Sequence, residues 1–401
     1  MKSTKIVGIV ALLAVGACVS TATKPTTAPL DDVLRAAVEQ KRVPAVVAMV
    51  ATGDGVVYQG AVGVGKDGIF SIASMTKPVT SVAVMQLVEA GKVKLDEPAA
   101  TYLPELGAVQ VLENGGLRAA KGQITVRLLL THTAGFAYEF LNRELFDYAS
   151  KGKVPSVMAG GDGFMKAPLL FDPGARWEYG INTDWLGKLV EKVSGQTLEA
   201  YFKEHIFTPL GMADSFFEVP ADKRGRLVPH FQRADDGKLV EQPAAPAQPV
   251  TFFSGGGGLH STAGDYIKFA RAMMAGGQLG QARVLTAESV ALMGQNQIGE
   301  LELRPPTSVM PQLVNPGAIL PGNLDKFGLG FALNTKPVAK GRGAGTLSWA
   351  GIFNTFFWID RDKKVCAVLM TQVLPFLDDG SKALVDDFDR AVYAWRDAAA
   401  R

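Results

Sequence analysis

The sequence predicts a mixed α/β (α+β) fold in which both ends of the chain build one antiparallel sheet. Two β-rich runs near the N-terminus, residues 45–50 and 56–64, flank a hairpin signal at residues 52–55. Strand-like runs return near the C-terminus, whereas helical patterns and Gly/Pro-rich loops alternate between them. We therefore expect terminal helices to cover the sheet, with a mostly helical domain inserted and a cleft between the two parts.

The spacing of apolar residues predicts the individual elements. Residues 30–42 have helical spacing, which Pro44 limits, and residues 74–90 predict a long helix that is apolar around most of its circumference. Such a helix belongs inside a protein. Further helices are expected at 126–131, 184–193, 198–205, 263–274, 287–293 and 382–398, and C-terminal strands at 328–333, 346–349, 355–359 and 365–372, with a hairpin turn at 360–363.

These elements predict two structural domains. Residues 30–95 and 300–401 are expected to form the mixed α/β domain. Residues 96–299 are expected to form the mostly helical domain, with the active site between the two.

The first residues follow the order of a secretory signal peptide. Lys2 and Lys5 precede an apolar run, residues 6–13, that is too short to span a membrane comfortably. Small residues then continue up to Cys18. This order predicts export.

The four residues that end at Cys18 resemble a bacterial lipoprotein signal. Residues 1–17 are interpreted as the signal peptide, Cys18 as the lipidated first residue and residues 18–29 as a linker. Plain secretion, with cleavage after Ala17 or Ala22, is the alternative. We expect a periplasmic or outer-membrane-anchored lipoprotein of a Gram-negative-type bacterium, with possible membrane attachment through that lipid; its oligomeric state is open.

Composition excludes several classes of function. The 401 residues are 47% hydrophobic and 20% charged, and 41 basic against 39 acidic residues give a formal charge of +2. No long run of one sign favours a nucleic-acid partner. Paired cysteines and an H-E-x-x-H motif are absent, so no metal and no other cofactor is expected. Cys366 lies in an apolar run and is interpreted as a buried strand thiol.

The motif Ser74-Met75-Thr76-Lys77 supplies a nucleophile and a base. Residues three apart on a helix share a face, so the amine of Lys77 can reach the hydroxyl of Ser74. An apolar helix would desolvate the lysine and lower its pKa, as a base requires. The alternative is a helix N-cap serine beside a snorkelling lysine. A second S-x-x-K match at residues 150–153 lies in a polar stretch and is interpreted as a solvated loop.

A series of blocks around this motif resembles the β-lactamase-related serine hydrolases of the penicillin-binding-protein-like superfamily. The blocks occur in the family's order over roughly residues 30 to 395. They are Phe70 to Lys77, Gly91 to Asp96, Leu128 to Gly135, Pro173 to Tyr179, Gly256 to Thr262 and Trp349 to Gly351. Within that family the chain resembles the family VIII carboxylesterases in particular. The resemblance implies a β-lactamase/transpeptidase-like fold with the site between the two domains.

The resemblance also implies that Tyr179 completes the catalytic set with Ser74 and Lys77. A phenol beside an ammonium can ionise below its usual pKa of about 10, so Tyr179 is expected to relay the proton from the nucleophile to the leaving group. The alternative for Tyr179 is a packed aromatic after a Pro-Gly turn. The backbone N–H groups of Ser74 and Ile352, which follows Gly351, are the candidates for the oxyanion hole.

Two departures from the class C β-lactamases favour esters over β-lactams. Ile181 stands where those enzymes have a substrate-binding asparagine, and Trp349-Ala350-Gly351 replaces their Lys-Thr-Gly strand. An uncharged, Trp-lined edge favours neutral acyl groups, although Trp349 could instead be a core aromatic.

We therefore expect an exported serine hydrolase that acts on small, short- to medium-chain carboxylic esters through a Ser74 acyl-enzyme. The alternatives are a β-lactamase or D-Ala-directed peptidase, a transacylase, and a non-catalytic cell-envelope binding protein. The natural substrate and the acyl chain length stay open.

Overall fold

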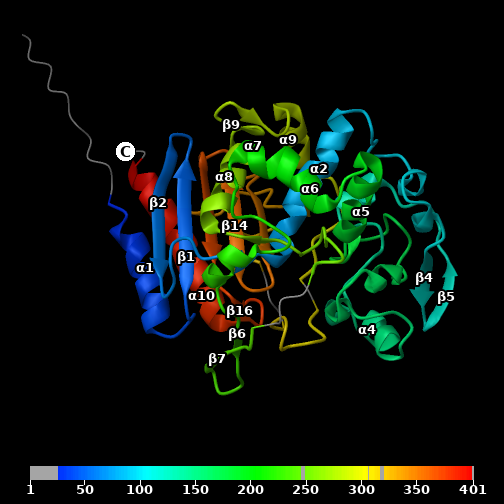
Figure 1. Ribbon diagram of the computed structural model, residues 1–401, viewed down its shortest axis with the longest axis horizontal. Coiled ribbons are helices and arrows are strands. Elements are labelled where there is room, and N and C mark those ends of the chain that lie inside the picture. Colours follow the sequence, from blue (N-terminus) through cyan, green and yellow to red (C-terminus); the bar gives the residue numbers. More distant parts are fainter. Residues whose placement is uncertain (1–25, 245–248, 306, 317–319, 400–401) are drawn as a thin grey trace, which may run out of the picture.

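A seven-stranded antiparallel sheet joins the two ends of the chain (Figure 1). The computed structural model describes residues 26–244, 249–305, 307–316 and 320–399, so the predicted signal peptide and Cys18 lie outside the described residues. The strand order is β11-β12-β13-β14-β15-β1-β2. The strands are β1 (Val46–Thr52), β2 (Gly55–Val62), β11 (Lys326–Phe327), β12 (Ala332–Leu333), β13 (Leu347–Gly351), β14 (Thr355–Asp360) and β15 (Val365–Met370).

The centre of the sheet pairs strands that lie far apart in sequence. β1 runs antiparallel to β15, with Val47 opposite Met370 and Thr52 opposite Val365. The predicted hairpins β1–β2 and β14–β15 flank this pairing on either side. Every residue of β14 and β15 is buried, which requires cover on both faces of the sheet. The predicted sheet built from both chain ends is thus confirmed.

Helices supply this cover. The terminal helices α1 (Ala28–Glu39) and α10 (Asp379–Ala399) pack against each other, and the ring of Phe388 on α10 contacts Trp358 of β14. α8 (Ala263–Met274) packs on β1, β14 and β15. α8 thus packs on the sheet, although it lies within residues 96–299, which are expected to form the helical domain.

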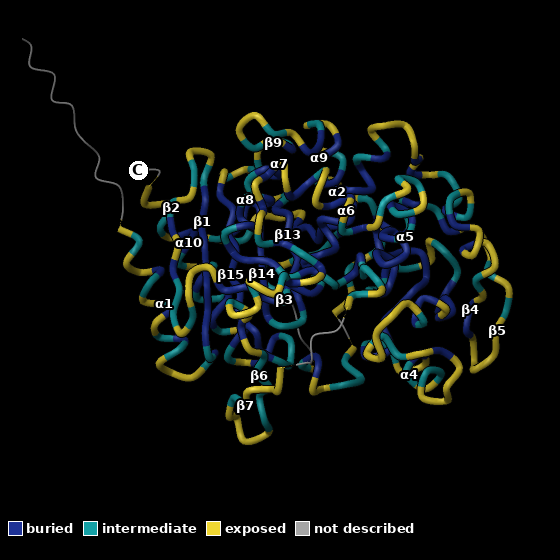
Figure 2. The backbone as a smooth tube through the Cα atoms, in the orientation of Figure 1, coloured by how far each residue is buried: buried dark blue, intermediate teal, exposed yellow. Residues whose placement is uncertain are grey.

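The helical part of the molecule surrounds α2 (Thr76–Glu89) and α5 (Asn182–Ser194), which pack against each other. α2 is buried along most of its length, as its apolar circumference predicts (Figure 2). The other helices are α3 (Val126–Leu130), α4 (Arg143–Ser150), α6 (Leu198–Phe202), α7 (Thr208–Leu210) and α9 (Ala287–Met293).

Three short strand pairs, one three-stranded sheet and single helical turns complete the described chain. The remaining strands are β3 (Phe70–Ser71), β4 (Gln110–Glu113), β5 (Gly116–Ala119), β6 (Phe231–Arg233), β7 (Leu239–Glu241), β8 (His260–Ser261), β9 (Gln278–Leu279), β10 (Ala282–Arg283) and β16 (Val373–Leu374). The turns are η1 (Ala73–Met75), η2 (Ala99–Thr101), η3 (Pro104–Gly107), η4 (Glu139–Leu141), η5 (Val157–Ala159), η6 (Gly163–Lys166), the π-helical η7 (Lys203–Phe207) and η8 (Ala221–Arg226).

Three predicted elements differ from the structure. Only the last two residues of the expected strand 328–333 are a strand, β12, because residues 328–331 form the turn between β11 and β12. In this turn the amide of Gly328 donates to the Phe331 carbonyl, and Gly330 has a positive φ. The expected helix 198–205 ends at Phe202 and continues as the π turn η7. The expected helix 74–90 begins with the 3₁₀ turn η1.

Candidate active site

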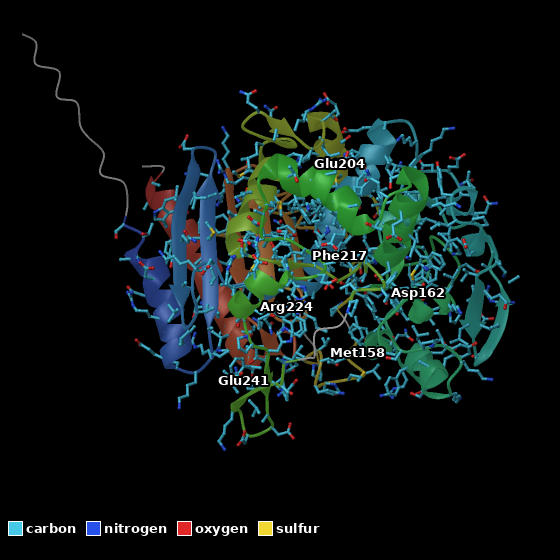
Figure 3. The ribbon with its side chains drawn as sticks, in the orientation of Figure 1. Met158, Asp162, Glu204, Phe217, Arg224 and Glu241 are labelled. Atoms are coloured by element: carbon cyan, nitrogen blue, oxygen red, sulfur yellow. The ribbon has the colours of Figure 1, made fainter. Side chains whose placement is uncertain are left out.

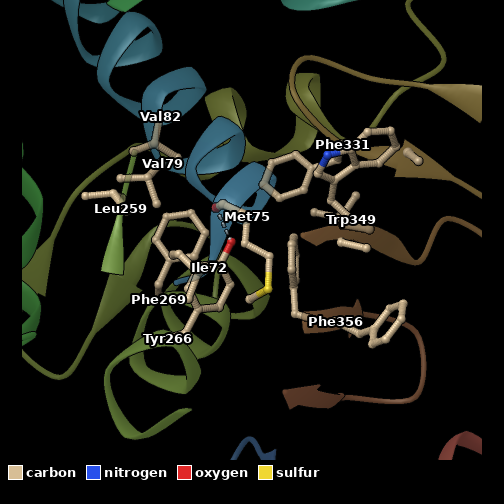
Figure 4. Packing of buried hydrophobic residues seen from close by; sticks show 14 of the residues in the cluster. Ile72, Met75, Val79, Val82, Leu259, Tyr266, Phe269, Phe331, Trp349 and Phe356 are labelled. Carbon is tan, nitrogen blue, oxygen red and sulfur yellow. Dashed lines mark hydrogen bonds between the residues drawn. The ribbon is translucent and has the colours of Figure 1, made fainter. Parts of the chain in front are cut away.

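Ser74 lies in η1, immediately before α2, and its turn is held from several sides. Tyr266 of α8 donates its hydroxyl proton to the carbonyl of Met75 at 2.8 Å (Figure 4). Thr76 Oγ1 accepts from the amide of Leu259 at 3.1 Å. Ala73 has a φ of 42°, an unfavourable conformation for a residue with a Cβ. The surrounding contacts therefore fix a strained backbone at the nucleophile.

Lys77 lies one turn further along the chain and is buried, at 1% exposure. Its Nζ lies 3.2 Å from Ser74 Oγ, 3.1 Å from Tyr138 Oη and 2.6 Å from the carbonyl oxygen of Gly256. Burial lowers the pKa of Lys77 to about 7, although the carboxylate of Asp184 opposes this shift. At neutral pH a large share of Lys77 is therefore the free amine.

The free amine suits the three contacts of Lys77. A neutral amine has two N–H donors and one lone pair. Tyr138 Oη and the Gly256 carbonyl can accept the two N–H groups, and the lone pair then faces the hydroxyl of Ser74. In this arrangement the lone pair of Lys77 can accept the proton of Ser74.

Tyr179 completes the predicted set. Its hydroxyl donates to Ser74 Oγ at 2.6 Å, and its ring packs against those of His132 and Trp349, with centroids 5.0 and 5.1 Å away. Burial raises the pKa of Tyr179, with the hydrogen bond to Ser74 opposing. The expectation that Tyr179 ionises below 10 is therefore wrong, because desolvation of the phenolate outweighs the hydrogen bonds with Ser74 and Trp349 that favour it. Tyr179 is thus a neutral hydrogen-bond donor to Ser74, and Lys77 is the neighbour whose pKa allows it to accept a proton.

β13 supplies the wall opposite the nucleophile. Trp349, Gly351 and the following Ile352 line the same cavity as Ser74. A Cβ on Gly351 would overlap the carbonyl oxygen of Ile72, so only glycine lets β13 approach the nucleophile turn this closely. The two predicted oxyanion donors, the amides of Ser74 and Ile352, thus belong to segments in direct contact.

The cavity in front of Ser74 has a volume of about 760 Å³. Most of its wall is apolar and comes from loops of the helical part, the segment before β11 and the segment after β16. The apolar lining includes Phe140, Leu313, Val314, Leu320, Leu324 and Phe376. Met158 lies on this wall and is 61% exposed, which puts it at the mouth (Figure 3). A site of this size and polarity suits an organic acyl group.

The carboxylates of Glu178 and Asp184 also line the cavity. The charge of Glu178 is balanced by Arg176. Glu178 accepts from Arg176 Nε at 3.0 Å and from Asn142 Nδ2 at 2.8 Å.

Ile181 is buried away from the cavity lining, and Asn182 contacts His132 Nδ1 at 3.0 Å. Asn182 therefore does not take the place of the substrate-binding asparagine that class C β-lactamases have at the position of Ile181.

His132 is buried beside Tyr179, and His260 is partly buried. Burial and the charge of Lys77 lower the pKa of His132 far below its usual range, and burial lowers that of His260 to about 4. Neither imidazole is an efficient base at neutral pH. Cys366 is a buried thiol of β15. Within the described ranges, no group of three His, Cys, Asp or Glu side chains could hold a metal ion.

Three contributors to the site were not predicted from the sequence. Tyr138 comes from the loop after α3, Asp184 from the first turn of α5 and the Gly256 carbonyl from the glycine-rich segment before β8. Tyr138 follows closely on the block that ends at Gly135, which was the available signal. Asp184 resembles an ordinary acidic residue in the first turn of a helix.

Comparison with known proteins identifies the family. A family model described as Beta-lactamase matches residues 30–390, which is most of the chain. The chain belongs to the β-lactamase family. Its fold is the β-lactamase/transpeptidase-like fold, with mixed helices and an antiparallel sheet.

Within the β-lactamase family, this chain is similar to proteins that handle acyl groups. Monacolin J acid methylbutanoyltransferase of Aspergillus terreus is 34% identical over 341 residues, covering 80% of this chain and 81% of the relative. Lovastatin esterase of Penicillium rubens is 30% identical over 355 residues, covering 82% and 87%. The unliganded structure of simvastatin synthase from Aspergillus terreus superimposes with a TM-score of 0.79 at 31% identity, covering 91% and 97%. This family member is thus an enzyme of the serine hydrolase and acyltransferase type.

Proposed function

We propose that this protein is an exported serine hydrolase that cleaves small carboxylic esters of short to medium chain length through an acyl-enzyme on Ser74. One observation carries the proposal. Ser74 Oγ lies between the desolvated amine of Lys77, at 3.2 Å, and the hydroxyl of Tyr179, at 2.6 Å, in the wall of a mostly apolar cavity. A nucleophile, a base whose pKa is near neutral and a proton donor are the parts that acyl transfer needs.

In the first step, the free amine of Lys77 takes the proton of Ser74 while Oγ attacks the ester carbonyl. The amides of Ser74 and Ile352 stabilise the oxyanion in this proposal. When the tetrahedral intermediate collapses, the bond to the alcohol breaks, and Tyr179 gives its proton to the departing oxygen and receives one from the Lys77 ammonium. Water then attacks the acyl-enzyme and gives a proton to Lys77. The bond between the acyl carbon and Ser74 Oγ breaks, Oγ takes that proton from Lys77, and the acid is released.

The cavity wall supports neutral esters over β-lactams. Trp349 occupies the strand position at which a cation would hold the carboxylate of a β-lactam, and its ring contacts Tyr179. Because buried apolar and aromatic surface gains free energy from an apolar acyl chain, esters suit this wall better than anionic lactams. β-Lactamase and D-Ala-directed peptidase activities are the competing hypotheses, together with a binding protein that turns nothing over.

Transfer of the acyl group to an alcohol is the second candidate function. The names of two relatives, a methylbutanoyltransferase and an esterase, describe transfer to another molecule and hydrolysis. Both reactions can use one acyl-enzyme and differ only in whether an alcohol or water attacks it. An acceptor alcohol added to the assay separates them, because a transferase forms the new ester faster than the free acid.

Export and lipidation at Cys18 are part of the proposal and rest on the sequence of residues 1–18. In the described part of the chain, no helix has the length and apolar character needed to cross a membrane. Mass spectrometry of the protein purified from its native host tests the proposal. A chain that begins at a lipidated Cys18 supports it, and a chain that retains residues 1–17 contradicts it.

Hydrolysis of p-nitrophenyl acetate, butyrate and octanoate, measured beside nitrocefin, tests the activity. We expect ester turnover by the wild type, little nitrocefin turnover, and loss of ester turnover in Ser74→Ala. Ser150→Ala is the matched control, because Ser150 begins the exposed second S-x-x-K match and lies outside the cavity lining. Fast nitrocefin cleavage without ester turnover would make the protein a β-lactamase, and inactivity on both would favour the peptidase or binding hypotheses.

A further inference from the structure

A buried carboxylate in the wall of the cavity has no part in the steps above. Asp184, in the first turn of α5, is 2% exposed. Its Oδ1 accepts from the Ser254 hydroxyl at 2.6 Å and from the Gly256 amide at 3.0 Å. The carbonyl of the same Gly256 accepts from Lys77 Nζ at 2.6 Å. One peptide segment thus connects the carboxylate to the lysine.

We propose that Asp184 is a positioning residue for Lys77: it aims the Gly256 carbonyl at the lysine, and its negative charge sets how readily Lys77 holds a proton. This inference rests on the proposed function, since it concerns the base of that reaction. It assigns Asp184 no contact with the substrate.

The packing around Asp184 favours this role over that of an ordinary helix-terminal carboxylate. Its two donors from outside α5, the Ser254 hydroxyl and the Gly256 amide, belong to the segment that contacts Lys77. A Cβ on Gly256 would overlap the second carboxylate oxygen of Asp184, so the segment fits closely over the carboxylate. Because the Gly256 amide and carbonyl are held from opposite sides, a change at Asp184 alters the direction of the carbonyl.

The other groups facing Lys77 carry little charge near neutral pH. Burial raises the pKa values of Tyr138 and Tyr179 and lowers that of His132, so all three are neutral. Glu139, beside Tyr138, instead accepts from the Ser156 hydroxyl and the Val157 amide.

The charge of Asp184 raises the proton affinity of Lys77, against the larger and opposite effect of burial. Burial raises the pKa of Asp184 itself, but the charge of Lys77 and the hydrogen bonds from Ser254 and Gly256 favour its ionised form. An anion close to an ammonium in a buried site stabilises the protonated lysine. Loss of that negative charge should make Lys77 a weaker base that loses its proton at lower pH.

The test measures the rate at which a fluorophosphonate labels Ser74, as a function of pH, because labelling reports the activation of Ser74 without a known substrate. Asp184→Asn keeps an acceptor for Ser254 and Gly256 but removes the charge. We expect the inflection of its labelling profile to move to lower pH by about half a unit to one unit. Asp265→Asn is the matched control, because Asp265 is also buried and accepts hydrogen bonds but pairs with Lys268 outside the cavity lining.

Ser254→Ala separates charge from positioning, because it keeps the carboxylate and removes one of its donors. We expect a slower labelling plateau in this variant and a smaller shift of the inflection than in Asp184→Asn. An unshifted profile in a folded Asp184→Asn variant would overturn the inference while the proposed function stands. If Asp184→Asn does not fold, a Ser254→Ala variant that matches the wild type in rate and inflection overturns it. A wild type that is not labelled would instead refute the proposed function, and the inference with it.

Discussion

Activity should rise with pH through about 7, because the free amine of Lys77 is the form that accepts the proton of Ser74. Burial lowers the pKa of Lys77 from 10.5 to about 7, which corresponds to about 5 kcal/mol of lost stability for the ammonium. The active fraction is then about one tenth at pH 6 and about nine tenths at pH 8. We therefore expect kcat/KM to increase about tenfold between these two values. No fall is expected until well into the alkaline range, since the pKa of Tyr179 is raised.

The assay is hydrolysis of p-nitrophenyl butyrate between pH 5 and 9, followed at the isosbestic wavelength of nitrophenol and nitrophenolate, with spontaneous hydrolysis subtracted. Circular dichroism at each pH establishes that the protein stays folded. A histidine base would titrate in the same range, but the pKa of His132 is lowered far below it. A flat profile between pH 6 and 8, or an inflection at the ordinary pKa of lysine, would refute the assignment of the desolvated Lys77 as base.

Three further outcomes follow from the structure. A lysine whose pKa is lowered in the folded state binds fewer protons when folded, so folding becomes more favourable as the pH rises. Between pH 7 and 9 the unfolding free energy of the wild type, measured in urea, should rise by about 2 kcal/mol relative to that of Lys77→Met. A difference between the two proteins that is constant with pH would contradict this. Gly180→Ala should lower the free energy of unfolding by about 1–3 kcal/mol, because a Cβ at residue 180 overlaps neighbouring backbone. In the control Gly225→Ala the Cβ meets open space. Equal melting temperatures of the two variants would count against this packing. Leu313→Trp should lower the ratio of kcat/KM for the octanoate ester to that for the acetate ester by about tenfold, because the larger side chain narrows the cavity. The control Leu117→Trp, at an exposed residue, should leave this ratio unchanged. An unchanged ratio in Leu313→Trp would show that the acyl chain lies elsewhere.

Local spacing in the sequence was enough to predict the centre of the site. Ser74 and Lys77 are one helical turn apart, so their contact needs no knowledge of the rest of the fold. Tyr179 was predicted from the resemblance alone, because 105 residues separate it from Ser74 and only tertiary packing brings the two hydroxyls together. The sheet was predictable because alternation and hairpin turns are also local signals.

The remaining parts of the site depend on packing that the sequence does not express locally. Tyr138 and Gly256 reach Lys77 from segments 61 and 179 residues away. Asp184 acts through the Gly256 segment, so no spacing rule connects it with the lysine. The expected ionisation of Tyr179 was wrong for a related reason. Its sign depends on whether burial or the neighbouring charge is larger, and burial is known only from the fold.

The surface on which α8 packs was less predictable than the helix itself. α8 follows the glycine-rich segment inside the predicted helical domain, yet it packs on β1, β14 and β15. Its apolar face was evident from the sequence, and its length was predicted correctly as residues 263–274. The apolar face of a helix does not specify which surface it covers. That depends on how the whole chain folds.

Mass spectrometry of the acyl-enzyme tests the central claim most directly. The protein is mixed with p-nitrophenyl butyrate, quenched in acid within the first turnovers, digested and sequenced by fragmentation. The account predicts one butyryl group on the hydroxyl of Ser74, and none in Ser74→Ala. Ester turnover that persists in Ser74→Ala, or a butyryl group on any other residue of an active wild type, would contradict it.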